Sequence, residues 1–289
     1  MNAFHINWTK PFFLRNHDRS YFVEDYELLT TILSALEWRK HNGSIKMVTD
    51  EVGAEYYNLL GLTHIWDLGI DKTLDTLIDN TIYPLSFWAA GKIFALQQQT
   101  VPCVMIDTDF IVWKSLAADI KDAALAVAHR EDINEKIYPE KSFFNMDTNY
   151  KFPAEWDWNV LPCNTALLYI ADKKLKEYYT SESIKFMKNL RETKNITAEM
   201  VFDEQRLLAM CAAVMGIRIN TFLDIANMQT QNAFTHVWGF KNELQANQEK
   251  RRDFCQSCVK RIMYDYPEEF PVLEKIERLA VFRDRHYIA

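Results

Sequence analysis

Apolar segments typical of buried strands alternate with segments of helical periodicity along most of this chain. Residues 44–51 and 123–132 predict strands that end in polar groups, residues 160–170 predict a buried strand, and residues 21–42 predict a helix. Such alternation favours an α/β fold in which a mostly parallel central sheet is flanked by helices. The other predicted strands are 4–13 (running into a loop), 64–68, 102–107 and 217–222, and the other predicted helices are 54–63, 83–99 and 198–216.

Composition limits the kinds of protein this can be. With 289 residues, 48% hydrophobic and 25% charged, the chain has the values of an ordinary globular protein of one large domain or two small ones. The net charge of −7 argues against a nucleic-acid partner, which needs a broad positive surface. No apolar run reaches about 18 residues, residues 1–16 do not resemble a signal peptide, and five cysteines suit reduced core thiols, so we expect a cytoplasmic protein.

Two aspartates directly follow the apolar run of the strand predicted at 102–107. A buried carboxylate without a partner is costly, so Asp107 and Asp109 should lie at the end of the strand, where the chain turns. In parallel sheets ligands bind at the carboxyl ends of strands. The two carboxylates would repel each other unless a divalent cation such as Mg²⁺ or Mn²⁺ bridged them, and a turn with solvated aspartates is the structural alternative.

Three other predicted strands also end in polar groups. The polar groups at these strand ends are Thr9–Lys10, residues 49–51 and residues 129–131. If the strands are parallel, all of these groups converge on the edge of the sheet that carries Asp107 and Asp109. We call these two aspartates and the residue between them the D-x-D segment, and we expect a site at this edge.

Together with the D-x-D segment, four stretches stand in the order shown by glycosyltransferases of the GT-A fold, and the chain resembles that fold group, in particular family 8. The opening HINWTKPFF is similar to the mannosyltransferase and toxin-like members as well. Three positions depart from the family 8 pattern: Lys241 is one residue closer to Gly239, Ala166 replaces a glycine and Glu204 replaces an aspartate. The four stretches are SFWAAGKIFAL with Lys92, PCNTALLYI with Asn164, FDEQRLLAMCA with Glu204–Gln205, and FTHVWGFKN with His236, Gly239 and Lys241.

The resemblance implies a metal-dependent glycosyltransferase of the hexosyltransferase type that retains anomeric configuration. It would use a nucleotide-sugar, UDP-linked by similarity, and a glycan or lipid-linked acceptor in surface polysaccharide synthesis. Asp107, Asp109 and His236 would bind Mn²⁺ or Mg²⁺. The implied donor-binding residues are Trp8, Thr9, Asp50, Lys92, Asp107, Thr108, Gly239 and Lys241, and the implied catalytic residues are Glu204, Gln205 and Asn164.

Several of these residues have a purely structural alternative. Asp203 could be the N-cap of the predicted helix, with Glu204 in its first turn. Asn164 could satisfy backbone groups beside its strand, and Lys92 could be a solvated helix residue. Trp156 and Trp158 could stack on sugars or pack under a loop.

Two other functions fit the D-x-D segment. A phosphatase of the haloacid dehalogenase type would use one aspartate as nucleophile and the other as general acid. That family expects Thr or Val at position 111, where Ile111 stands, and carries its motif near the start of the chain. The other alternative is a nucleotide-sugar-binding protein without turnover.

The chain is predicted to divide into a GT-A-like nucleotide-sugar-binding and catalytic domain, residues 1–242, and a helical extension, residues 243–289, packed on it. The extension carries basic residues among apolar ones. A helix of this kind could rest on an anionic membrane surface at the inner face of the membrane, or form a solvated face packed on the domain. The basic residues are Lys250, Arg251, Arg252, Lys260 and Arg261.

Overall fold

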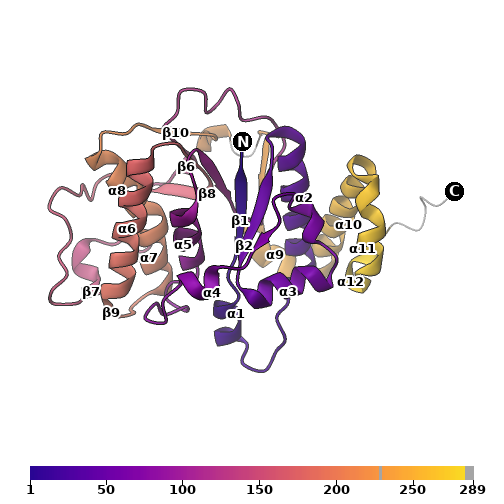
Figure 1. Ribbon diagram of the computed structural model, residues 1–289, viewed down its shortest axis with the longest axis horizontal. Helices are drawn as coiled ribbons and strands as arrows, with labels where there is room; N and C mark the ends of the chain where they lie inside the picture. The colour runs from indigo at the N-terminus through magenta and orange to yellow at the C-terminus, as the bar shows by residue number, and fades with distance from the viewer. Residues whose placement is uncertain (228–229, 284–289) are drawn as a thin grey trace.

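The computed structural model describes residues 1–227 and 230–283, and its centre is a seven-stranded sheet in the order β10-β6-β8-β4-β1-β2-β3 (Figure 1). Strand β1 (Ala3–Asn7) pairs in parallel with β2 (Ile45–Thr49) and β4 (Cys103–Ile106). Strand β8 (Cys163–Ile170) is antiparallel to both of its neighbours, β4 and β6 (Leu125–Arg130). The mostly parallel sheet that the sequence predicts is therefore confirmed.

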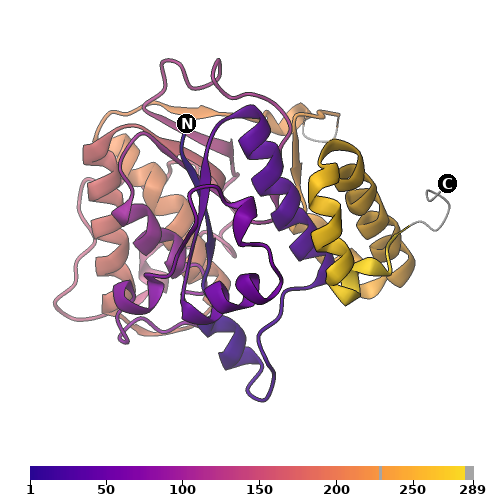
Figure 2. The same cartoon turned by 45° about the vertical axis from the view of Figure 1, so that its right-hand side comes forward.

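Helices cover both faces of this sheet and form two hydrophobic cores with it (Figures 1 and 2). On one face lies α2 (Asp25–His41), against which α10 (Gln248–Asp265) packs from outside. Because α2 lies between the sheet and α10, it is buried along most of its length, including Leu28, Ile32 and Leu36. The opposite face is covered by α5 (Ala90–Gln98), α6 (Lys173–Asn189) and α8 (Leu207–Val214).

The remaining elements are short. Strand β5 pairs with β11 and strand β7 with β9, each as a two-stranded sheet. The strands are β3 (Ile70–Asp71), β5 (Phe110–Val112), β7 (Asn145–Met146), β9 (Leu190–Glu192), β10 (Ile219–Thr221) and β11 (Phe234–His236). The helices are α1 (Lys10–Arg15), α3 (Glu51–Leu59), α4 (Leu74–Leu77), α7 (Ile196–Val201), α9 (Lys241–Ala246), α11 (Phe270–Lys275) and α12 (Glu277–Ala280).

Four local predictions differ from the structure. Residues 10–15 form helix α1 instead of a loop, with Pro11 in the first turn, where a missing N–H costs nothing. Residues 63–65 form a 3₁₀ turn, and the strand predicted at 64–68 lies at residues 70–71 instead. Helix α5 begins at Ala90, not at residue 83. The long helix α6 was not predicted, although Asp172 caps it by accepting a hydrogen bond from Leu175 N at 2.8 Å.

The C-terminal helices belong to the core on the α2 side. Cys258, Val259 and Ile262 of α10 are buried in it, and the predicted boundary at residue 242 falls within α9. Cys255 and Cys258, like the other three cysteines, are buried free thiols. Residues 284–289, included in the predicted helical tail, lie outside the described residues.

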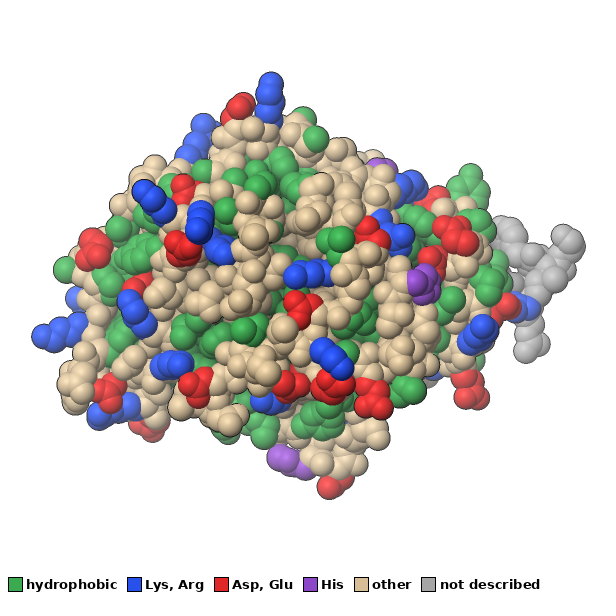
Figure 3. Space-filling model, in the orientation of Figure 1, with side chains coloured by type: hydrophobic (Ala, Val, Ile, Leu, Met, Phe, Trp, Pro, Cys, Tyr) green, Lys and Arg blue, Asp and Glu red, His purple; other side chains and the backbone are tan. Residues whose placement is uncertain are grey.

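The basic residues of the tail are largely paired with acidic ones. Arg251 lies 2.6 Å from Glu24 and 2.8 Å from Asp25, and Lys250 pairs with Glu243. Figure 3 likewise shows acidic and basic side chains interspersed around the C-terminal helices on the face in view. Within the described residues, no helix has both the length and the apolar character needed to span a bilayer.

Candidate active site

A turn at the end of β4 brings the two aspartates of the D-x-D segment together. Asp107 N donates to Ala166 O on β8 at 2.8 Å, and Phe110 N donates to Asp107 O at 2.9 Å, which closes the turn before β5. The predicted turn at this strand end is thus present. The register of β1 and β4 pairs Ala3 with Val104 and Phe4 with Met105, so the segments after both strands lie at the same edge of the sheet.

Strand pairing also brings His236 to this turn. Strand β11 is antiparallel to β5 with His236 opposite Phe110, and Val237 N donates to Asp109 O at 3.1 Å. As a result, one ligand atom each from Asp107, Asp109 and His236 lies within 4.8 Å of the others.

These three side chains fit a divalent cation. Burial lowers the pKa of His236 to about 4, although Asp109 opposes the shift, so the imidazole is neutral at pH 7 and has a free nitrogen lone pair. Burial raises the pKa of Asp107 to about 6, against the effect of Lys92. The pKa of Asp109 is lowered, because Lys241 and His236 outweigh its burial. Two carboxylates and a neutral imidazole are ligands that Mn²⁺ and Mg²⁺ accept.

Two lysines flank the carboxylates. Lys92 Nζ lies 2.6 Å from Asp107 Oδ1 and 2.6 Å from Glu204 Oε1. Lys241 Nζ lies 3.0 Å from Asp109 Oδ2 and 2.9 Å from Glu27 Oε1. Burial alone would lower the pKa of both lysines, but the neighbouring carboxylates outweigh it and raise both pKa values, so both stay charged. Lys241 follows the 3₁₀ turn at residues 238–240 and reaches Asp109, although it lies one residue closer to Gly239 than the family 8 pattern has it.

Glu204 and Gln205 lie in the middle of a continuous helical segment, not at a helix start. The segment begins with α7, which Asn195 caps, and continues through a π-helical turn at Phe202–Arg206 into α8. The alternative that Asp203 is an N-cap is therefore wrong. Asp203 is fully buried and accepts a hydrogen bond from Ser183 Oγ at 2.6 Å. The widened turn changes which residues face the sheet, and Glu204 points to Lys92.

Partners from other elements hold both residues. Glu204 Oε1 accepts a hydrogen bond from Thr165 Oγ1 at 2.5 Å, and Gln205 Oε1 accepts one from Tyr138 OH at 2.5 Å. Tyr138 belongs to the long segment between β6 and β8, which Arg206 anchors. The Arg206 guanidinium donates to Tyr138 O at 2.8 Å, to Pro139 O at 2.9 Å and to Trp158 O.

Sequence reasoning missed these supporting residues. The alternation of strands and helices carries no signal for Tyr138 in its loop, whereas a lone arginine in an apolar helix was a signal that Arg206 is buried with partners. Trp156 and Trp158 take the structural alternative, since Trp156 is buried and the Trp158 ring stacks on Phe202 with centroids 5.4 Å apart.

Other predicted site residues already have partners within the protein. Asp50 caps α3 by accepting from Gly53 N at 2.9 Å, and it also accepts from Thr9 N at 2.7 Å and Thr9 Oγ1 at 2.9 Å. Asn164 accepts from Ala166 N and donates to Glu131, both at 3.1 Å. Their contacts to a donor or acceptor stay predictions.

Three further predicted residues lie at the same edge of the sheet. Trp8 follows β1 and is largely buried, and Thr108 lies in the D-x-D turn. A Cβ atom at Gly239 would meet nothing within 4 Å, so the protein itself does not require glycine there. Their predicted donor contacts also remain untested.

Comparison with solved structures finds glycosyltransferases, as the resemblance predicted. Mouse xyloside xylosyltransferase 1 matches with a TM-score of 0.42 and 9% identity over 78% of this chain and 86% of its own. The galactosyltransferase LgtC, in complex with donor and acceptor sugar analogs, matches with 0.36 and 12% over 76% and 73%. The glycosyltransferase GlyE of Streptococcus pneumoniae matches with 0.37 and 13% over 77% of this chain, which spans 46% of GlyE. These likenesses are distant, with TM-scores below 0.5 and identities of 9–13%.

Comparison with other sequences gives a family but no activity. No curated protein matches this chain. A family model described as a family of unknown function matches residues 1–276, and the chain therefore belongs to that family, DUF6734.

Proposed function

We propose that this protein is a metal-dependent glycosyltransferase that moves a sugar from a nucleotide-sugar to an acceptor hydroxyl. The observation that carries the proposal is the meeting of Asp107 and Asp109 with His236, which is distant from them in the sequence, and with two half-buried lysines at the carboxyl edge of parallel strands. This edge is where ligands bind in sheets of this kind. If these carboxylates and lysines only paired with one another to stabilise the fold, a neutral imidazole facing both carboxylates would add nothing to that pairing.

Asp107, Asp109 and His236 would hold Mn²⁺ or Mg²⁺, whose positive charge would stabilise the diphosphate that leaves when the glycosidic bond breaks. Lys92 and Lys241 contact the same carboxylates and lie close enough to donate to phosphate oxygens as well. Thr108 and Gly239 would line the diphosphate, and Thr9 and Asp50 the nucleoside. Trp8, which the resemblance places with the donor, lines a cavity beside α1.

Glu204, Gln205 and Asn164 would act at the sugar ring. Glu204 is fixed in place by Lys92 and Thr165, and Gln205 by Tyr138. A fixed carboxylate and a fixed amide can stabilise an oxocarbenium-like transition state or orient the acceptor hydroxyl without reorganising during the reaction.

The finer features of the reaction rest on the sequence resemblance. We propose a UDP-linked donor of a hexose, retention of configuration, and a glycan or lipid-linked acceptor in surface polysaccharide synthesis. We also propose that residues 1–242 carry these functions and residues 243–289 pack on them, in a cytoplasmic protein that could touch the inner face of the membrane through its tail.

Thermal unfolding with ligands tests the proposal. UDP-glucose and UDP-galactose should raise the Tm in the presence of Mn²⁺, since a ligand at a hundred times its Kd adds about 2.7 kcal/mol of stability. Asp109→Asn should remove the Mn²⁺-dependent part of the rise, whereas Asp119→Asn, at an exposed aspartate paired with Lys114, should keep it.

The same samples separate the alternatives. A metal response that Asp109→Asn leaves unchanged would contradict the ligand assignment. Release of phosphate from p-nitrophenyl phosphate without any sugar acceptor would favour the phosphatase. Binding of the nucleotide-sugar without any hydrolysis, with metal present, would favour a binding protein without turnover.

A further inference from the structure

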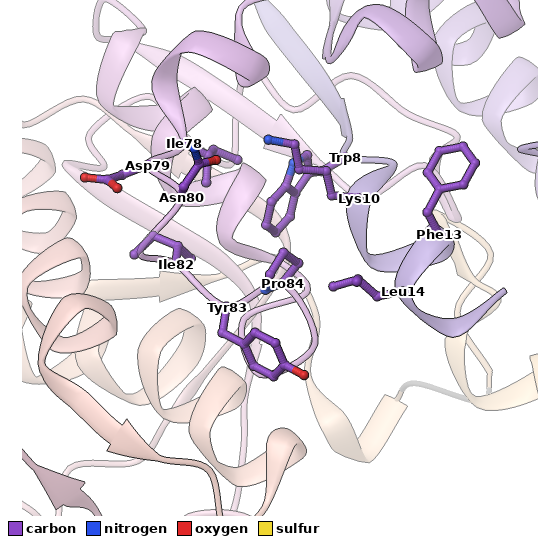
Figure 4. A pocket seen from close by; sticks show the side chains of 10 residues that line it. All are labelled: Trp8, Lys10, Phe13, Leu14, Ile78, Asp79, Asn80, Ile82, Tyr83 and Pro84. Carbon is purple, nitrogen blue, oxygen red and sulfur yellow. The ribbon is translucent and has the colours of Figure 1, made fainter. Parts of the chain in front are cut away.

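We propose that a cavity between α1 and residues 78–84 binds an apolar aglycone of the acceptor, an alkyl or aryl group attached to its sugar. The proposal rests on the proposed function, because it names the acceptor class of that site. The cavity measures about 410 Å³ and is drawn in Figure 4. This volume lies within the range of small-molecule sites, roughly 300–1,000 Å³.

The walls of the cavity are apolar. Phe13 and Leu14 approach from α1, Ile82 and Tyr83 approach from the facing loop, and the Trp8 indole lies between them (Figure 4). A sugar ring or a diphosphate needs several polar partners when it is buried, whereas an alkyl or aryl group needs contact with surfaces of this kind.

The charged groups at the cavity are few. Asp79 is engaged, since it accepts from Thr81 N at 2.9 Å and from Lys188 Nζ at 3.0 Å. The ammonium group of Lys10, whose Nζ lies 3.9 Å from Asp75 Oδ1, places a positive charge at the rim of the cavity. The exposed amide of Asn80 also lines the cavity. The chemistry of the lining therefore favours a ligand that is apolar at one end and polar at the other.

One polar atom of the lining has no partner. Trp8 Nε1 is buried and donates no hydrogen bond to any of the residues that the structure describes. A buried donor of this kind is usually satisfied, if not by protein then by water or ligand.

The cavity lies at the same edge of the sheet as the carboxylate cluster. Trp8 follows β1 and Asp107 follows β4, and these parallel strands are neighbours that end at the same edge of the sheet. Trp8 also packs on α5, because its Cβ lies 3.1 Å from where a Cβ would lie at Gly91. The next residue, Lys92, pairs with Asp107. An aglycone in the cavity would thus place its sugar at the edge of the sheet that carries the proposed site of transfer.

Binding of simple glycosides to the full chain tests this inference without donor or metal. By titration calorimetry, n-octyl or phenyl β-D-glucopyranoside, below any micelle-forming concentration, should bind at least tenfold more tightly than methyl β-D-glucopyranoside. Preference for octyl would indicate a lipid-type acceptor, and preference for phenyl an aromatic one; either supports the cavity. Equal affinity for all three glycosides would overturn the proposal.

Variants locate the binding. Leu14→Trp fills the cavity from α1 and should lower the affinity for the octyl or phenyl glucoside at least tenfold. Tyr83→Ala changes a side chain that is 55% exposed, so it should not disturb folding, and it should lower the same affinity severalfold. It tests the cavity even if Leu14→Trp folds poorly. Leu59→Trp, at an exposed leucine on α3 outside the cavity, is the matched control and should bind as the wild type does. Unchanged binding in both cavity variants would contradict the assignment.

UDP with Mn²⁺ is titrated into the same proteins. A fall in its affinity in Leu14→Trp would mean that the cavity takes the base of the donor and would overturn the acceptor assignment. If the wild type bound the octyl or phenyl glucoside but no UDP, the proposed function would fail and the acceptor assignment with it, while an apolar ligand site would stand.

Discussion

At the scale of single residues, Lys92 is the side chain that offsets the negative charge of the site when no ligand is bound. It lies between the half-buried carboxylate of Asp107 and the buried carboxylate of Glu204, at 2.6 Å from each. Removing one partner of a buried ion pair leaves the other charge uncompensated, which typically costs about 3–5 kcal/mol.

We therefore expect Lys92→Met to lower the free energy of unfolding by about 3 kcal/mol in urea denaturation, because two carboxylates would then face each other in a buried site. The double variant Lys92→Met/Glu204→Gln should recover a good part of the loss, since one of the two charges is gone. A double variant no more stable than Lys92→Met would contradict the proposed role of Lys92.

Asp203 gives a prediction for pH dependence. Burial raises its pKa well above the usual range, against the hydrogen bond from Ser183. A carboxyl group with a raised pKa in the folded state stabilises the protein below its unfolded pKa, and this stability is lost as the pH rises through the folded pKa.

Asp203→Asn, which keeps the shape of the side chain without its titration, should therefore flatten the fall of stability above pH 4. Urea midpoints of wild type and variant between pH 4 and 8 measure this. Parallel curves for the two proteins would show that Asp203 does not titrate as its burial implies.

At the scale of elements, the π-helical turn and the segment between β6 and β8 act as one unit. Arg206 is fully buried and donates to three carbonyl groups of that segment. Because Tyr138 in the same segment donates to Gln205, the position of Gln205 depends on this anchor.

Arg206→Ala should release the segment and cost about 2–4 kcal/mol, because buried carbonyls lose their donors. Hydrogen exchange should rise in residues 138–158 and stay unchanged in α2. Lys173→Ala, which removes an exposed lysine paired with Glu177 on α6, is the control and should change neither the stability nor the exchange of residues 138–158. Equal protection of residues 138–158 in wild type and Arg206→Ala would contradict the anchoring role.

The elements also show what the sequence could and could not predict. The strand before Asp107 was predictable because a long apolar run bounded by polar residues has few other places in a fold. His236 was predicted from the resemblance of FTHVWGFKN to a family motif. The pairing of β5 with β11 is what places this histidine beside Asp109 in the structure. The place of Asp203 in its helix was not predictable, because a π-helical turn leaves no mark in hydrophobic periodicity.

The errors outside the site have similar causes. The strand expected at 64–68 was inferred from a short apolar run, and the structure turns there and pairs residues 70–71 with β2 instead. Helix α6 was overlooked although Leu175, Tyr179 and Phe186 mark its buried face, because lysines and polar residues dilute that pattern.

At the scale of the whole molecule, the C-terminal helices complete the core. Ile262 of α10 is fully buried against α2, whereas Tyr264 on the same helix is 86% exposed. The helices after residue 242 therefore share one hydrophobic core with α2 and the sheet.

Ile262→Ala should thus lower the free energy of unfolding of the whole chain by about 2–4 kcal/mol in a single cooperative transition. Tyr264→Ala should change it by less than about 0.5 kcal/mol. Two separate unfolding transitions, with only one of them shifted by Ile262→Ala, would instead show that the tail folds as a unit of its own.

Whether a divalent ion binds between Asp107, Asp109 and His236 can be measured most directly by anomalous X-ray diffraction from crystals grown with Mn²⁺ and UDP. The site predicts one strong manganese peak in contact with all three side chains, and no such peak in crystals of Asp109→Asn. Fully occupied UDP with no manganese at these residues, or manganese bound only elsewhere, would contradict the proposed metal centre.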